Sequence, residues 1–432
     1  MRFAIVTLGC KVNQYESQAL EQAGVLRGHQ LCDLNDPAGL DAYIVNTCTV
    51  TAVSDQKNRQ LIRRLRQGHP KAALAVCGCF PQTHPGSAEA LGADLVCGTG
   101  DRGAFWDALE AVYRDRSHPA THVDDAMARR TFEELPSGGL SGRTRALLKV
   151  EDGCCNFCAY CIIPYARGPV RSLPLERAAE QATRLGLEGY QEIVVNGIEI
   201  SSWGRDLPGK PPLIDLLEAL SAAAPGVRLR LGSLEPRTVD EDFCRRAMRL
   251  ENLCPHFHLS LQSGCDATLK AMNRKYDSVR YLRSVELLRQ YFDDPGLTTD
   301  LIVGFPGETE EDFQESLAFV EKCGFSALHI FPYSRRPGTP ADKLPGQIPN
   351  AEKKRRAAVA AEAAEGLRLA YNRRQVGKVF PVLFEEEKDG AWQGHAPNYV
   401  TVRVQGTNLH NQVRSVRITE GTAQGLVGEI AE

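Results

Sequence analysis

Short runs of apolar residues alternate with longer amphipathic stretches over the first hundred residues. Helical patterns such as 15–27 and 54–67 separate apolar runs that end at glycine, cysteine or a polar residue, at 3–10, 42–48, 72–79 and 94–98. Strands that alternate with helices are typical of a parallel sheet covered on both faces. The sequence therefore predicts a doubly wound α/β domain at 1–115.

The same alternation returns after residue 143. Six strand patterns, most of them followed by a helical stretch, lie at 145–153, 190–200, 227–236, 256–264, 297–309 and 327–334. Six such units predict a partial TIM-type (βα)6 barrel over 144–370, in which a long charged helix begins at 351. Between the two α/β regions, residues 116–143 are charged and then rich in glycine and serine, which is typical of a linker.

The pattern changes again over 371–432. Short apolar runs such as VFPVLFEE, YVTVRV and QVRSVRI are separated by glycine, asparagine and aspartate, so we expect a small all-β barrel. Arg403, Arg414 and Arg417 lie on strand patterns that contain no acidic residue. They are candidates for contacting RNA, and solvated surface charge is the ordinary alternative.

Length and charge narrow the class of protein. The chain has 432 residues, with 51 Lys and Arg against 54 Asp and Glu, and a net charge of −3. This length predicts two or three domains, and the small net charge excludes a polycation that binds nucleic acid by bulk charge alone. No apolar run reaches the roughly 18–20 residues of a membrane span, and the apolar start is too short for a signal peptide. We expect a soluble cytoplasmic protein, with a monomer favoured.

Fourteen cysteines carry the candidate chemistry. Cys154, Cys158 and Cys161 form a C-x3-C-x2-C loop directly after the first predicted barrel strand, where TIM-type active sites lie. Three thiolates can hold three irons of a 4Fe–4S cluster and leave the fourth iron open to a ligand such as S-adenosylmethionine. The alternative is a structural zinc site with Cys155 as the fourth ligand, but no second pair of closely spaced cysteines is evident nearby.

Three of the first four predicted strands end at a thiol, namely Cys10, Cys48 and Cys79. The carboxyl ends of parallel strands meet at one edge of a sheet, so cysteines far apart in the sequence can converge there. This arrangement favours a second cluster over three separately buried thiols. Cys77 and Cys97 also lie near strand ends, and the sequence leaves open whether either takes part.

These motifs resemble those of the radical S-adenosylmethionine (SAM) methylthiotransferase family. The segment EDGCCNFCAYCIIPYARGPVRS (151–172) is similar to the radical cluster loop, and the family's three amino-terminal cysteine motifs resemble TLGCKVNQYES (7–17), NTCTVT (46–51) and CGCF (77–80). The resemblance covers the whole chain. It implies an amino-terminal methylthiotransferase domain, a radical SAM domain and a carboxyl-terminal TRAM domain that binds RNA.

The resemblance also implies ligands and cofactors. The three thiols of the 154–161 loop would hold the radical 4Fe–4S cluster, and the three strand-end thiols would hold an auxiliary 4Fe–4S cluster. Tyr160 would lie near the adenine of S-adenosylmethionine, and later strand ends that line the pocket carry Gly197, Ser233 and Gln262. Cys77 stands where the family more often has a small or hydroxyl residue.

The wording of the motifs favours one branch of the family. GCKVNQ, NTCTVT and ARGPVRS resemble the type that methylthiolates C2 of N6-threonylcarbamoyladenosine at position 37 of tRNA, next to the anticodon. The alternatives are the type that modifies N6-isopentenyladenosine, the type that modifies a ribosomal protein, and a non-enzymatic RNA-binding protein with a structural metal or cluster. The resemblance further implies the tRNA anticodon loop as a partner and a one-electron donor such as flavodoxin or ferredoxin.

Overall fold

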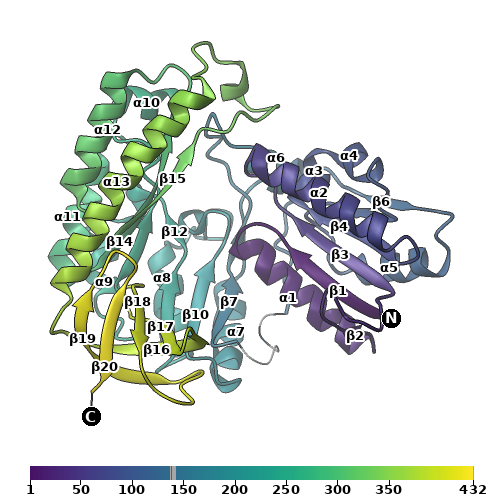
Figure 1. Ribbon diagram of the computed structural model, residues 1–432, viewed down its shortest axis with the longest axis horizontal. Coiled ribbons are helices and arrows are strands. Elements are labelled where there is room, and N and C mark those ends of the chain that lie inside the picture. Colours follow the sequence, from purple (N-terminus) through teal and green to yellow (C-terminus); the bar gives the residue numbers. More distant parts are fainter. Residues whose placement is uncertain (137, 139–142, 432) are drawn as a thin grey trace.

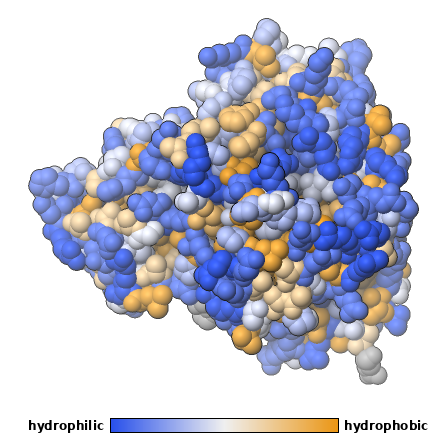
Figure 2. Space-filling view, turned by 180° about the vertical axis from the view of Figure 1, so that it is seen from behind, coloured by the Kyte–Doolittle hydropathy of each residue, from blue (hydrophilic) through white to orange (hydrophobic). Residues whose placement is uncertain are grey.

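The computed structural model describes residues 1–136, 138 and 143–431, and part of the predicted linker, 137 and 139–142, lies outside them. Three sheet-based units follow one another along the chain (Figure 1): a sheet covered by helices (purple to blue), an open barrel (teal to green) and a small closed barrel (yellow). No described helix is long and apolar enough to cross a membrane. The face in Figure 2 is mostly hydrophilic, with hydrophobic residues in small groups.

The amino-terminal unit is a parallel sheet in the order β2-β1-β3-β4-β5-β6. Its strands are β1 (Arg2–Thr7), β2 (Gln30–Leu31), β3 (Ala42–Thr47), β4 (Ala73–Gly78), β5 (Leu95–Cys97) and β6 (Ala120–His122). Every residue of β3 and β4 is buried because helices cover both faces. Helices α1 (Lys11–Leu26) and α5 (Phe105–Arg114) pack on one face and α2 (Ala52–Gly68) on the other. The prediction of a doubly wound domain is confirmed.

Two short helices, α3 (Cys79–Thr83) and α4 (Pro85–Glu89), follow β4. The edge strand β6 pairs with β5 and lies within 116–143, the segment that the sequence predicts as a linker. Farther along that segment, Leu135 packs against Tyr15 of α1, and its carbonyl accepts a hydrogen bond from the tyrosine hydroxyl. The described parts of 116–143 therefore contact the amino-terminal unit.

The central unit is an open barrel of parallel strands in the orders β11-β10-β7 and β12-β13-β14-β15, which confirms the predicted partial barrel. Its strands are β7 (Arg145–Lys149), β10 (Glu192–Asn196), β11 (Arg228–Leu231), β12 (Ser233–Leu234), β13 (His256–Leu259), β14 (Gly296–Val303) and β15 (Ala327–Pro332). The helices around them are α7 (Leu175–Leu187), α8 (Leu213–Ala223), α9 (Glu241–Ala247), α10 (Asp266–Ala271), α11 (Ser278–Tyr291), α12 (Glu310–Cys323) and α13 (Asn350–Arg374).

The carboxyl-terminal unit is a closed barrel in the order β16-β17-β18-β20-β19, which confirms the predicted all-β barrel. Its strands are β16 (Val379–Lys388), β17 (Ala391–His395), β18 (Thr401–Val404), β19 (Val413–Gly421) and β20 (Leu426–Ile430). Alternating apolar residues such as Val402 and Val404 fill the interior. The barrel docks on the open barrel through an ion pair between Arg145 and Glu385 (2.8 Å) and a hydrogen bond from Arg230 to the Pro397 carbonyl.

Candidate active site between three units

A short antiparallel pair of strands closes the loop of the open barrel that contains Cys154, Cys158 and Cys161. Strand β8 (Glu151–Asp152) pairs antiparallel with β9 (Arg171–Ser172), and α6 (Ile163–Arg167) lies inside the loop that they close. Burial raises the pKa of Cys154, and the nearby thiols of Cys161 and Cys158 raise it further. Arg274 Nη1 donates to Cys158 Sγ at 3.1 Å, whereas Cys155 is exposed. Three of the four loop thiols therefore share one site.

The three strand-end thiols of the amino-terminal sheet also meet. Cys10 is the residue before α1, Cys48 follows β3, and Cys79 opens α3 directly after β4. Burial raises the pKa of Cys79 to about 12, and the thiols of Cys48 and Cys10 contribute to the rise. Asn13 Nδ2 donates to the Thr47 carbonyl at 2.7 Å, which ties α1 to the end of β3. The edge of the sheet thus brings together cysteines from three separate segments.

Cys77 and Cys97 occupy a different place. Both are buried in the hydrophobic core beneath α5, in one cluster with Phe105 and Trp106. Burial raises the pKa of Cys97 to about 12, with Cys77 as the nearby thiol that adds most. Cys97 has the surroundings of a buried small apolar residue. Burial also raises the pKa of Cys77, but Arg102 contacts this thiol and lowers the pKa.

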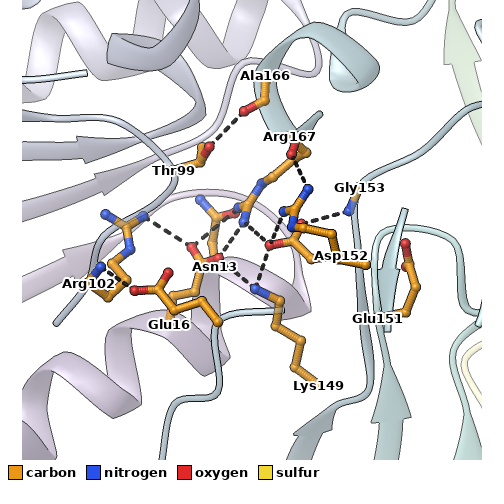
Figure 3. A network of polar contacts seen from close by, with 12 residues as sticks. Asn13, Glu16, Thr99, Arg102, Lys149, Glu151, Asp152, Gly153, Ala166 and Arg167 are labelled. Carbon is orange, nitrogen blue, oxygen red and sulfur yellow. Dashed lines mark hydrogen bonds and ion pairs between the residues drawn. The ribbon is translucent and has the colours of Figure 1, made fainter. Parts of the chain in front are cut away.

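A buried network of charges joins the two cysteine sites (Figure 3). Glu16 of α1 pairs with Arg102 at 3.2 Å, with Lys149 of β7 at 3.3 Å and with Arg167 of α6. Asp152 of β8 pairs with Lys149 at 2.7 Å and with Arg171 of β9 at 3.3 Å. Every one of these side chains is at most 6% exposed. The network fixes the cysteine loop against α1, next to the strand-end triad.

This network carries more positive than negative charge. Its ion-paired members are four cations and two carboxylates, and Arg167 is the cation with the largest effect on the Cys79 thiol. Burial would raise the pKa of Glu16, but Arg167 and the neighbouring cations lower it below its ordinary value, so the carboxylate stays ionised. A buried surplus of positive charge beside three thiols is suited to an anionic group, as a thiolate-bound iron–sulfur cluster is.

The spacing of the triad thiols also matters for the group that they hold. In the described part of the chain, two sets of three ligand atoms lie within 4.8 Å of one another, and neither includes a triad cysteine. A zinc ion at about 2.3 Å from each thiolate needs sulfur atoms roughly 4 Å apart. The three sulfur atoms of each triad thus do not all lie within 4.8 Å of one another, a spacing that suits a cluster of several irons better than one zinc ion.

A cavity of about 610 Å³ opens where the three units meet. Cys10 of the strand-end triad, Gly197 after β10 and Ser233 of β12 line it, and the carboxyl-terminal barrel contributes His395 and Tyr399. At Gly197 a Cβ atom would lie 2.7 Å from the Glu151 carboxylate, so a side chain has no room there. Of the predicted pocket residues, Gly197 and Ser233 line the cavity.

Tyr160 and Gln262 lie elsewhere. Tyr160 packs against the buried cluster of Met272, Phe305 and Tyr333. Burial raises the pKa of its hydroxyl, and the nearby thiols of Cys158 and Cys161 raise it further. Gln262 bonds through its backbone to Asp300 and adopts a left-handed conformation with φ of 71°. Neither residue is among those that line the cavity.

Several cavity residues were not predicted from the sequence. Alternate residues of β13, β14 and β15 face the cavity: His256, His258, Thr298, Asp300, Ala327 and His329. Tyr399 lies 4.7 Å from the His256 ring and 5.7 Å from Lys11 Nζ, measured at ring centroids. The period of two along each strand is the signal that would have found the first group. The position of Tyr399 in the cavity depends on how the carboxyl-terminal barrel docks, which no pattern in the sequence indicates.

The predicted RNA-contacting arginines are on the carboxyl-terminal barrel. Arg403 is half-buried on β18, and Arg414 and Arg417 are exposed on β19. Within the described ranges, no carboxylate lies within 4.0 Å of any of the three. Their charges are therefore available to a partner.

Comparison with protein families identifies the first two units. The model of the radical SAM superfamily matches residues 148–320, which contain the cysteine loop and most of the open barrel. A second model, described as uncharacterized protein family UPF0004, matches residues 2–98 of the amino-terminal sheet. The protein is thus of the radical SAM class, with a UPF0004 domain before the barrel. The class implies a 4Fe–4S cluster and S-adenosylmethionine.

Curated relatives narrow the class. The threonylcarbamoyladenosine tRNA methylthiotransferase MtaB of Bacillus subtilis is 37% identical over 94% of this chain and 90% of its own. The protein of the same description from Thermotoga maritima is 37% identical over 98% and 95%. A tRNA-2-methylthio-N(6)-dimethylallyladenosine synthase of Caldicellulosiruptor saccharolyticus is 32% identical over 99% and 92%. This chain belongs to the methylthiotransferase family of radical SAM enzymes.

Solved structures support the fold. The radical SAM methyltransferase TsrM from Kitasatospora setae superposes with a TM-score of 0.59 and 15% identity, over 90% of this chain and 79% of TsrM. At this identity the likeness concerns the architecture alone. It shows that a sheet domain beside an open barrel is an arrangement shared with other radical SAM enzymes.

Proposed function

We propose that this protein methylthiolates C2 of N6-threonylcarbamoyladenosine at position 37 of tRNA. One observation carries the proposal: Cys10 of the strand-end triad lines the same cavity as Gly197 and Ser233 of the open barrel. A substrate base in that cavity would lie beside Cys10, and the loop triad, none of whose thiols lines the cavity, would act on it through S-adenosylmethionine held near Gly197 and Ser233. The activity named for the MtaB relatives supports the same reaction.

We assign the two triads to two clusters. Cys154, Cys158 and Cys161 would hold the radical 4Fe–4S cluster, and Cys10, Cys48 and Cys79 an auxiliary 4Fe–4S cluster. When bound with S-adenosylmethionine, these groups supply the radical and the methylthio sulfur for C2, a carbon too inert for acid–base chemistry. Around them, the chain buries Cys48, Cys79 and Cys158 and sets Arg274 beside Cys158 and Arg167 near Cys79. Burial by itself raises the pKa of Cys48 and Cys79 and disfavours the thiolate, whereas the two arginines favour negatively charged ligation.

The cavity walls also suit this nucleoside. Lys11 and Arg368 line the cavity, and no carboxylate of the described residues lies within 4.0 Å of either. Burial would raise the pKa of Tyr399, but the positive charges of Lys11 and Arg145 lower it. The charge of Lys11 therefore produces a positive potential at the cavity wall. A threonylcarbamoyl group brings a carboxylate to these cations, whereas an isopentenyl group would cover the half-buried Lys11 without pairing its charge; Arg368 is exposed and keeps its water. This charge pattern favours the first nucleoside over the second.

Other residues and partners complete the proposal. Gly197 and Ser233 would contact S-adenosylmethionine, with Tyr160 near its adenine and Gln262 at the edge of the site. The carboxyl-terminal barrel would act as a TRAM domain that binds the tRNA anticodon loop. We retain the domain limits 1–115, 144–370 and 371–432, and the segment between the first two adds the edge strand β6 to the amino-terminal sheet. A flavodoxin or ferredoxin as electron donor, a monomeric state and a cytoplasmic location stay predictions.

The direct test uses an anticodon stem-loop that carries either modified adenosine. Anaerobically reconstituted protein, S-adenosylmethionine and a one-electron reductant should convert the threonylcarbamoyl form to its 2-methylthio derivative, as read by mass analysis of the digested RNA. Conversion of the isopentenyl form instead would support that alternative. Analysis of iron and acid-labile sulfide separates the non-enzymatic zinc alternative, because a zinc protein contains neither.

A further inference from the structure

Three side chains that the reaction does not use meet on the inner wall of the open barrel. His258 lies on β13, Asp300 on β14 and His329 on β15, three neighbouring strands. Asp300 stands opposite His329 in the strand register, and His258 stands opposite Thr298, two residues before Asp300. Because alternate residues of a strand face the same side, all three side chains face the cavity.

The ligand atoms of these residues are close together. One nitrogen from each histidine and one oxygen of Asp300 all lie within 4.8 Å of one another. His258 Nε2 is 3.4 Å from Asp300 Oδ2, and no hydrogen bond joins these two described atoms. Two atoms that bind the same metal ion also lie about this far apart without a hydrogen bond between them.

Thr298 orients one of the rings. Its hydroxyl lies 3.0 Å from His258 Nδ1 and 3.1 Å from His256 Nε2. A hydroxyl has one proton, so at least one of these imidazoles must donate to it. When His258 donates through Nδ1, its neutral ring presents the lone pair of Nε2 to the carboxylate of Asp300. Two electron-rich atoms then face each other, and a cation between them would satisfy both.

We propose that His258, Asp300 and His329 bind one divalent transition-metal ion at the cavity wall. Two imidazoles and one carboxylate are ligands that Mn²⁺, Fe²⁺, Co²⁺ or Zn²⁺ accept, and three ligands from one side leave positions open. Those positions face the cavity, where water or oxygen atoms of a substrate would fill them. The site contains no thiol and is distinct from both cysteine triads.

Manganese is the probe, because Mn²⁺ favours oxygen and nitrogen ligands over the thiolates of this chain. MnCl2 is titrated anaerobically into the cluster-loaded protein, and electron paramagnetic resonance measures free Mn²⁺. We expect one bound Mn²⁺ per chain, with histidine nitrogens visible in the pulsed spectrum. Thr298→Val should weaken binding roughly 10-fold, and His329→Ala and Asp300→Asn should weaken it by more than the roughly 10- to 100-fold typical of a lost outer partner.

The control is His118→Ala. His118 pairs with Asp115 at 2.9 Å on the exposed surface, so this variant removes a histidine–carboxylate contact outside the cavity. It should bind Mn²⁺ like the wild type, with equal iron content in all variants as the check on folding. The proposal is overturned if wild-type protein binds Mn²⁺ no more tightly than His329→Ala, or if bound Mn²⁺ shows no nitrogen signal. Neither result depends on methylthiolation, so the proposed function is tested separately.

Discussion

The two cysteine triads reach similar arrangements by different routes. Cys154, Cys158 and Cys161 belong to one loop, which β8 and β9 close at its base. The strand-end triad comes from three segments between residues 10 and 79, so it exists only when β1, β3 and β4 are aligned. A local motif and a folded edge can therefore build the same kind of site, and we expect the local motif to tolerate a disturbance of its surroundings better.

The cations beside the triads differ in the same way. Arg274, which donates to Cys158, belongs to the same open barrel as the loop. Arg167 is the cation that lowers the pKa of Cys79 most, and it belongs to a different unit, across the domain boundary from that thiol. We therefore expect the strand-end triad to depend more strongly on docking of the two units than the loop triad does.

Removal of one thiol from each triad should give the largest difference. Cys154→Ala should reduce 5′-deoxyadenosine formation to the uncatalysed background, because the radical site loses a ligand. Cys48→Ala should keep most of that cleavage and lose methylthiolation. Liquid chromatography with mass detection measures both products, and Cys155→Ala, which changes an exposed neighbour, is the control. Full methylthiolation by both triad variants would refute the two-site account.

Arg167→Met should disrupt the boundary between the units. It leaves Glu16 and Asp152 buried with fewer partners, and breaking a buried ion pair costs about 3–5 kcal/mol. Urea denaturation measures the free energy of unfolding, and iron analysis should show loss from the strand-end site first. Arg177→Met removes a half-exposed pair with Glu134 and should cost about 0–1 kcal/mol. Equal costs for the two variants would mean that the network does not hold the units together.

Lys11→Gln should change the choice of nucleoside. Loss of a charged hydrogen bond predicts a roughly 10- to 100-fold lower kcat/KM for the threonylcarbamoyl stem-loop. A stem-loop whose carboxylate is capped as a methyl ester should react equally with wild type and variant, and Lys11→Arg should retain most activity. An equal loss on the ester substrate would show that Lys11 does not contact this carboxylate.

Cys77→Ala should have the smallest effect. Cys77 lies in the core beneath α5, so its replacement should cost about 1 kcal/mol of stability and leave the iron content unchanged. Cys79→Ala, two residues away, should lose the iron of the strand-end site. The ratio of iron to protein in the two variants shows which of the two cysteines binds iron. A similar loss of iron in both variants would identify Cys77 as a ligand.

The sequence predicted the elements whose signal is local. The alternation of apolar runs and helices located β1, β3, β4 and the strands of the open barrel, because each carries its own pattern of buried residues. The strands β2 and β6 were not predicted because their residues are mostly exposed and contain no apolar run, whereas β5, which is also only three residues long, was predicted from its buried LVC. The loop triad followed from its spacing alone, whereas the strand-end triad also required the rule that parallel strands end at one edge.

The features that the sequence did not predict depend on contacts between distant segments. Glu16 and Arg167 meet across 151 positions, and in the sequence each is one more charged residue among many. Only docking of the two units shows that both are buried. Tyr399 likewise enters the cavity from the carboxyl-terminal barrel, a placement that no periodicity within its own strands encodes.

Iron and acid-labile sulfide counting on anaerobically reconstituted protein tests the central claim most directly. With two clusters, the wild type should contain about eight irons per chain, and Cys154→Ala and Cys48→Ala about four each. A wild type with about four irons, or a single variant that loses all of its iron, would contradict two separate cluster sites.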